Sequence, residues 1–226
     1  MFGWLGFRKR KIDEIKGKLS RDEILSKGRI LLVDDEKPDL IEDLQRARLT
    51  VDYVSDISTS NLEVLDRHTY SLVVLDFGGV GAGLGNEEGL SILRHIKRVY
   101  PATIVLAYTS KALTTEQSDF FRLADGVLLK DAGIAESLEK IEDALERSLD
   151  IKNLWKGMLH AAGIEPESSE DLELQDLFVR GLSDPSKLKV IGTKFAGFIK
   201  SEPAKKGASI AFEKLCEVAL KSAIGV

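Results

Sequence analysis

Cysteine is almost absent from this sequence, because Cys216 is the single one among 226 residues. A lone cysteine excludes a disulfide framework and a cysteine-built metal site, and it is typical of the reducing cytoplasm. No run of about 18 apolar residues occurs, so no transmembrane helix is expected. The apolar part of residues 1–18 is too short for a secretory signal and lacks a small-residue cleavage site. We therefore expect a cytoplasmic chain without disulfides.

Charge is unevenly distributed along the chain. Residues 1–28 hold eight basic and four acidic side chains, net +4. Residues 29–150 hold 13 basic and 23 acidic side chains, net −10, and residues 151–226 hold 11 basic and 10 acidic ones, net +1. An acidic central segment is a poor surface for nucleic acid, whereas it suits a divalent cation or a basic partner.

Strand and helix patterns alternate along residues 29–149. Short continuous apolar runs are typical of parallel strands buried on both faces, and amphipathic runs of helical period separate them. The predicted strands cover 29–35, 50–56, 70–79, 102–110 and 126–131. The predicted helices cover 38–48, 59–68, 86–100, 114–124 and 134–149. Five strand–helix units in succession predict an α/β fold with a doubly wound, five-stranded parallel sheet.

Polar residues follow several of these strands at the point where each strand ends. Asp34 and Asp35 follow the first strand, Asp76 ends the third, Thr109 the fourth and Lys130 the fifth. Ligands of such sheets lie beyond the carboxyl ends of the strands, so these side chains are expected to meet at one edge. Adjacent carboxylates repel each other unless a cation neutralises them, and the oxygen-rich site of Asp34, Asp35 and Asp76 suits Mg²⁺.

This set of residues, in this order, resembles the receiver domain of two-component response regulators, and the resemblance covers residues 29–149. It implies a flavodoxin-like fold and a sensor histidine kinase or phosphotransfer protein as partner. Carried onto this chain, it makes Asp76 the phosphoacceptor and Asp34 and Asp35 the Mg²⁺-binding pair, with a further metal contact from the Gly78 carbonyl. It also implies that Thr109 hydrogen-bonds the phosphoryl group and that Lys130 pairs with its charge.

Three features depart from the receiver pattern. The loop "FGGVGAGLGNEEG" after Asp76 is about five residues longer than usual, carries five glycines before Asn86 and is expected to be mobile. Asp131 follows Lys130 where the family usually has proline. Val127 stands where the family often has an aromatic residue that moves when the domain is phosphorylated. These departures leave open a pseudo-receiver, a binding module that works without phosphate.

The segments on either side of residues 29–149 match no family that we recognise. Residues 1–28 are predicted to form a basic, apolar arm with a helix over about 11–27, and residues 151–226 four helices. Basic residues are not concentrated on any of these helices, so DNA binding is not favoured. Residues 1–11 could lie on an anionic membrane, but packing on the protein or on a second copy is the favoured alternative.

The sequence thus predicts a response regulator that accepts a phosphoryl group on Asp76 with Mg²⁺ and signals through protein contacts of residues 151–226. The alternatives are the pseudo-receiver and, less favoured, a DNA-binding regulator. A multiple-turnover enzyme is not expected, because no acid–base pair stands outside the acidic set. Homodimerisation is left open.

Overall fold

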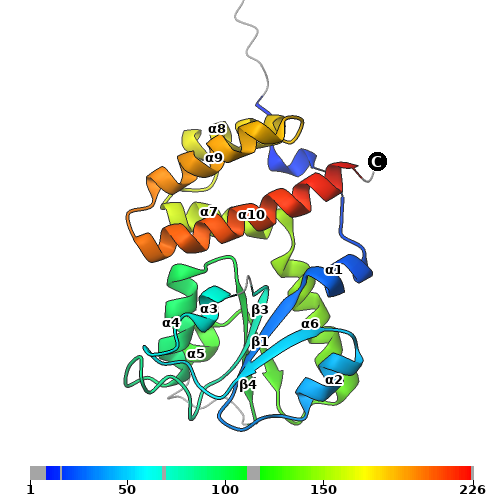
Figure 1. The fold of residues 1–226 in the computed structure, drawn as a ribbon, viewed down its shortest axis with the longest axis vertical. Coiled ribbons are helices and arrows are strands. Elements are labelled where there is room, and N and C mark those ends of the chain that lie inside the picture. The colour runs from blue at the N-terminus through cyan, green and yellow to red at the C-terminus, as the bar shows by residue number, and fades with distance from the viewer. Residues whose placement is uncertain (1–8, 16, 68–69, 111–117, 225–226) are drawn as a thin grey trace, which may run out of the picture.

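A computed structural model describes residues 9–15, 17–67, 70–110 and 118–224, and its centre is a parallel sheet (Figure 1). The strands lie in the order β2-β1-β3-β4-β5, and every pairing is parallel. Their bounds are Arg29–Val33 (β1), Thr50–Val54 (β2), Leu72–Asp76 (β3), Ile104–Thr109 (β4) and Gly126–Leu129 (β5). This is the flavodoxin-like order, so the predicted fold class is confirmed.

Helices cover both faces of the sheet. They are α2 (Leu40–Arg46), α3 (Val64–Arg67), α4 (Gly89–Val99), α5 (Ser118–Leu123) and α6 (Ile134–Ser148). One core joins α2 and α6 to β-strand residues such as Leu32, and the other joins α3, α4 and α5 to residues such as Leu31. Alternate residues of a strand therefore enter opposite cores, as expected for strands buried on both faces.

Helix α3 is shorter than the predicted helix over 59–68. The chain before it forms a turn in which the backbone N–H of Asn61 donates to the carbonyl of Ser58, and the Asn61 side chain accepts from the N–H of Ser58 at 2.6 Å. Asparagine and serine side chains commonly form such hydrogen bonds with the nearby backbone, which compete with the hydrogen bonds of a helix.

The N-terminal arm contains two short helical pieces instead of the predicted helix over 11–27. They are the 3₁₀ turn η1 (Ile12–Glu14) and helix α1 (Arg21–Lys27), which begins with a capping box between Ser20 and Glu23. Between them, Gly17 lies against Ser222, and a Cβ at position 17 would be 2.7 Å from the Ser222 Cβ. The single-helix prediction is wrong because a distant part of the chain approaches the arm here.

Residues 151–226 form the predicted four helices, called here the helical module. Its helices are α7 (Ile151–Ala162), α8 (Ser169–Gly181), α9 (Pro185–Phe198) and α10 (Glu202–Ile224). Aromatic rings fill its core, where Trp155 meets Phe195 edge to face at 5.2 Å and Phe178 at 5.5 Å. Ile12 of the arm is buried in the same core, so the arm packs on the module.

A buried carboxylate organises the helical module. Asp171 is 2% exposed, and its oxygens accept hydrogen bonds from Trp155 Nε1, the Gln175 side chain and the backbone N–H of Glu167. Gln175 in turn accepts from the backbone N–H of Ile12. Three donors compensate the burial of this charge, and the network also fastens the arm.

The helical module docks on the amino edge of the sheet, opposite the strand ends that carry the predicted site. Helix α10 runs across this edge (Figure 1), where Lys214 Nζ donates to the Ser71 hydroxyl at 2.5 Å. Burial lowers the pKa of Lys214 to about 8. Lys206 pairs with Asp66 at 2.8 Å, and Gly207 packs against the carbonyl of Val99. Apolar contacts add to these polar ones, since Ile210 of α10 packs on the core of the α/β unit and Ala102 packs on the core of the helical module.

No helix of the described part of the chain is long and apolar enough to cross a bilayer. The membrane alternative concerned residues 1–11, of which 1–8 lie outside the described residues. Lys9, Arg10 and Lys11 are exposed, and the backbone N–H of Arg10 donates to Asp176 of α8. The arm at residues 9–15 thus packs on the protein, whereas the aromatic residues to which both alternatives referred lie outside the described residues.

Candidate functional site

Three carboxylates meet at the carboxyl edge of the sheet. Asp34 and Asp35 follow β1, Asp76 ends β3, and one oxygen from each lies within 4.8 Å of the others. Asp34 is 1% exposed, the Asp76 side chain is 15% exposed, and Asp35 is open to solvent. The three acids predicted to meet at the strand ends therefore do lie together, and their roles stay predictions.

Lys130, just after β5, lies between two of these carboxylates. Its Nζ is 2.6 Å from Asp34 Oδ2 and 2.8 Å from Asp76 Oδ2. Asp34 Oδ2 accepts no well-aligned hydrogen bond among the described residues. The ion pair with Lys130 therefore offsets the cost of burying its negative charge. Burial lowers the pKa of Lys130, but the hydrogen bonds and charges of Asp34 and Asp76 outweigh it, and the pKa is raised.

Backbone and ring contacts hold the acids in place. The backbone N–H of Glu36 donates to Asp34 Oδ1 at 3.0 Å, and that of Phe77 donates to Asp76 Oδ1 at 2.7 Å. The Lys130 ammonium lies 5.2 Å from the centre of the Tyr108 ring, a cation–π contact. Burial raises the pKa of Tyr108, which keeps this neighbour uncharged.

Two contributors to the site were not among the predicted residues. The Tyr53 hydroxyl donates to the carbonyl of Asp34 at 3.0 Å and so steadies the end of β1. Gly79 has φ +71° and lies so close to Asp35 that a Cβ there would be 2.4 Å from Asp35 Oδ2. The place of Tyr53 near the end of β2 could have identified it, whereas no sequence signal distinguishes Gly79 from the other loop glycines.

The glycine-rich loop after Asp76 is fastened to the protein at its start. Val80 is fully buried in the core beneath α4, and the backbone N–H of Gly81 donates to Asp56 Oδ1 at 2.5 Å. Gly89 closes the loop at α4, where a Cβ would be 2.3 Å from the carbonyl of Asp76. Packing at both ends sets this loop beside the acids, and its expected mobility stays a prediction.

The remaining predicted residues lie at the same edge. Thr109 ends β4 with 6% exposure, in register with Leu129, and Gly78 is two residues beyond Asp76. Their contacts to a phosphoryl group and a metal stay predictions. Val127 is half-buried on β5, and no cis peptide bond occurs among the described residues, including the bond after Lys130.

The donor set suits a hard divalent cation. Three carboxylates face one ammonium, so the cluster keeps excess negative charge, and oxygen is the ligand that Mg²⁺ prefers. Asp35 is the most accessible of the three and has no side-chain ion pair among the described residues. Asp35 and Asp76 are thus the side chains best placed to hold the ion.

Replacing Lys130 by methionine is expected to lower the free energy of unfolding by about 2 kcal/mol without divalent metal, because buried Asp34 loses its counter-charge. Denaturant unfolding in a chelator measures the change. Lys140→Met is the matched control, because it removes an exposed pair with Glu136 and should cost no more than about 0.5 kcal/mol. Equal losses in the two variants would contradict the role of Lys130.

The sequence of the chain matches no known protein family profile and no curated protein. Among solved structures, the receiver domain of NtrX from Brucella abortus is 24% identical, with a TM-score of 0.44 over 52% of this chain and 98% of that one. The signal receiver domain of an HD domain-containing protein from Pseudomonas fluorescens is 22% identical, with a TM-score of 0.45 over 58% and 92%.

The chemotaxis response regulator CheY4 of Vibrio cholerae is 17% identical, with a TM-score of 0.44 over 52% of this chain and 98% of that one. At these identities and scores the likeness concerns the fold of about half the chain and does not assign an activity. The predicted resemblance to receiver domains agrees with the strand order β2-β1-β3-β4-β5 and with the cluster of Asp34, Asp76 and Lys130 at its carboxyl edge.

Proposed function

We propose that this chain is a response regulator that accepts a phosphoryl group on Asp76. The observation that carries the proposal is the position of Asp76, which ends β3 beside two other carboxylates and the Lys130 ammonium. The Asp76 side chain is 15% exposed and is held by hydrogen bonds at both oxygens. The source of the phosphoryl group would be a sensor histidine kinase or a phosphotransfer protein.

The chemistry is a single displacement at phosphorus. An Asp76 oxygen forms a bond to phosphorus, the bond from phosphorus to the donor breaks, and its electron pair leaves with the donor. Lys130 would offset the negative charge of the transferring oxygens from its position against Asp76 Oδ2. A bound Mg²⁺ would supply further charge neutralisation, held by Asp35 and Asp76 with the Gly78 carbonyl.

The output would be a protein contact of the helical module. Its junction with the α/β unit includes the Lys206–Asp66 ion pair, the hydrogen bond between Lys214 and Ser71, and the packing of Ile210 on the α/β core. A junction that mixes polar and apolar contacts permits relative motion more readily than a large hydrophobic one. The module is therefore a suitable element for a rearrangement that follows phosphorylation.

The pseudo-receiver remains the second candidate because of one observation. The backbone at Gly79 lies directly against Asp35, so the long loop occupies part of the space beside the most open carboxylate. A protein that switches without phosphate needs no access there.

Intact mass measurement after incubation with Mg²⁺ and acetyl phosphate tests the proposed function. The expected result is a gain of one phosphoryl group that is absent when a chelator replaces Mg²⁺ and is removed by hydroxylamine, which cleaves acyl phosphates. An unchanged mass in folded protein would sink the phosphoacceptor and leave the pseudo-receiver.

A further inference from the structure

A groove of about 420 Å³ lies between α4 and α5, and none of its lining residues belongs to the acidic cluster. Leu90, Arg94 and Lys97 face it from one helix, and Arg122 and Leu123 from the other. His160 of α7 stands at its border, so the docked helical module completes the groove.

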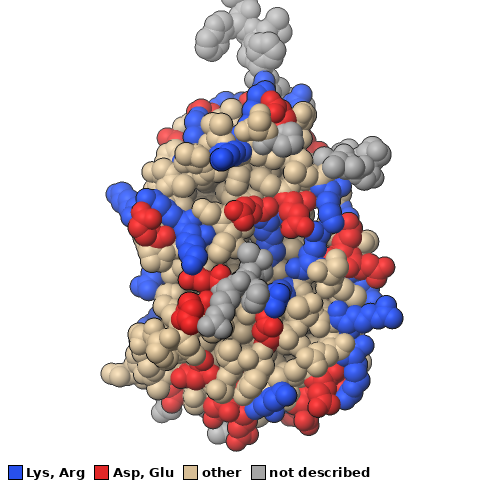
Figure 2. Space-filling model, viewed as in Figure 1, with Lys and Arg blue, Asp and Glu red and all other residues tan. Residues whose placement is uncertain are grey.

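The lining of the groove is basic, although the unit that forms most of it is strongly acidic. Residues 29–150 carry net −10, and acidic side chains are frequent along the lower rim of the α/β unit in Figure 2. Four arginine and lysine side chains and one histidine line the groove, against the single carboxylate of Asp119. Such a local reversal of sign marks a surface for an anionic partner.

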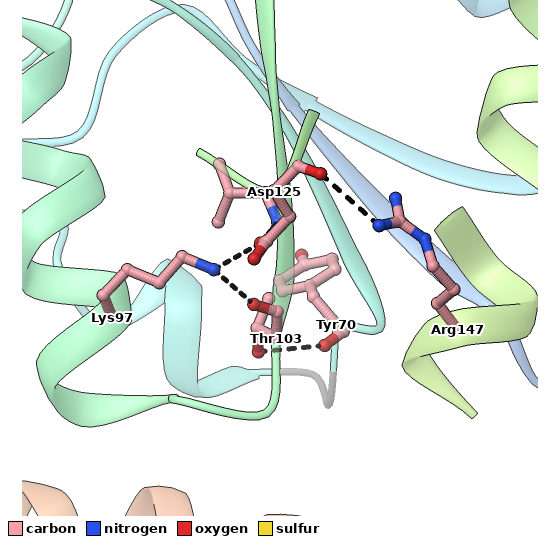
Figure 3. Close-up of polar contacts among 6 residues, drawn as sticks. Tyr70, Lys97, Thr103, Asp125 and Arg147 are labelled. Carbon is pink, nitrogen blue, oxygen red and sulfur yellow. Dashed lines mark hydrogen bonds and ion pairs between the residues drawn. The ribbon is translucent and has the colours of Figure 1, made fainter. Parts of the chain in front are cut away.

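Internal contacts leave part of this positive charge unused. The Lys97 ammonium pairs with Asp125 and donates to the Thr103 carbonyl (Figure 3). Arg94 pairs with Glu87, and Asp119 lies 3.0 Å from Arg122 and 3.8 Å from Arg94. The only ion-pair partner of Arg122 among the described residues is thus the exposed carboxylate of Asp119, which Arg94 shares.

Arg98 is the free charge of the groove. Neither Arg98 nor His160 has a hydrogen bond or ion pair among the residues that the structure describes. Arg98 is exposed and belongs to the last turn of α4. A carboxylate from a partner would pair with it without displacing an existing contact.

The floor of the groove is apolar. Leu123 is 36% exposed, which is high for a leucine, whereas Leu90 also lines the groove but is only 6% exposed. No aromatic side chain among the described residues lines the groove, so stacked nucleic acid bases find no platform there. The combination of an apolar floor and cationic rims suits the apolar face of a helix with flanking carboxylates.

We propose that this groove binds an acidic amphipathic helix of a partner protein. An apolar side chain of the partner contacts Leu90 and Leu123, and its carboxylates pair with Arg98 and Arg122. The inference needs no phosphoryl group on Asp76, so it can fail or hold independently of the proposed function.

Fluorescence anisotropy with a labelled helical peptide tests this surface. The peptide carries a leucine–phenylalanine face flanked by glutamates; one companion has glutamines for the glutamates and another has serines for the apolar residues. The full-length protein should bind the first peptide at least about tenfold more tightly than either companion, and added salt should weaken binding.

The variant R98E/R122E should lose at least about tenfold in affinity for the acidic peptide. Lys189→Glu is the matched control, because Lys189 is exposed on α9 and has no ion pair among the described residues. Leu123→Ser tests the floor separately, and thermal unfolding verifies that each variant is folded. The proposal is overturned by absence of binding up to about 1 mM, or by equal binding to R98E/R122E. Tighter binding of a single-stranded DNA oligonucleotide would also overturn it and favour a general polyanion site.

Discussion

The Asp76→Asn variant is expected to gain no phosphoryl group from acetyl phosphate and Mg²⁺, while the wild-type protein gains one. The amide oxygen that replaces the carboxylate is a poor nucleophile, so the bond to phosphorus does not form. The asparagine side chain can still accept hydrogen bonds from Phe77 and Lys130, since both donate to side-chain oxygen in the wild type. Chemistry should be lost while the fold persists.

The other two carboxylates should not replace Asp76. Asp34 is 1% exposed, and its two oxygens already face the N–H of Glu36 and the ammonium of Lys130. Asp35 is exposed but would be engaged with the metal, so Asp35→Asn should slow phosphorylation and weaken Mg²⁺ binding without removing the acceptor. Intact mass against time separates the two effects.

Asp131→Asn is the matched control for the acceptor. Asp131 follows Lys130 directly, is exposed, and has no hydrogen bond or ion pair among the described residues. It should be phosphorylated like the wild type. A phosphoryl gain that persists in Asp76→Asn would place the acceptor elsewhere, and normal output of that variant in cells would support the pseudo-receiver.

The Gly207→Ala variant is expected to lose about 3 kcal/mol or more in free energy of unfolding. A Cβ at this position of α10 would be 1.7 Å from the carbonyl oxygen of Val99, which is backbone and cannot rotate away. Helix α10 must then shift from the amino edge of the sheet, and its contacts through Lys206 and Lys214 would be strained.

Gly197→Ala supplies the comparison. Gly197 is also inside a helix, α9, but a Cβ there meets nothing within 4 Å. Alanine favours helix over glycine by about 1 kcal/mol, so this variant should be neutral or more stable. Denaturant unfolding measures both variants, and a stable Gly207→Ala would show that α10 does not dock closely at Val99.

Sequence patterns within short windows predicted most of the α/β unit, because each strand is a continuous apolar run. The polar residues at the ends of the strands all lie at the carboxyl edge of the sheet. Asp34, Asp76 and Lys130 could be placed together by that rule alone. The four helices of the module were likewise indicated by their caps and by Pro185 and Pro203 near their starts.

Contacts between distant segments account for what was not predicted. The helix predicted for the arm is interrupted where Gly17 contacts Ser222. No local sequence pattern indicates a contact between residues 205 positions apart. The basic groove depends on how α5 and α7 pack beside α4, and its charge is hidden in the net −10 of the surrounding sequence. Such features arise from packing and not from periodicity.

The attachment of the helical module at the amino edge has a consequence for assembly. Asp76 and Ser71 are five positions apart at opposite ends of one strand region, and α10 occupies only the Ser71 end. A phosphoryl donor that approaches the acidic edge therefore does not compete for space with a protein seated on the module. Under the proposed function, Asp76 would be phosphorylated without release of a partner bound to the helical module.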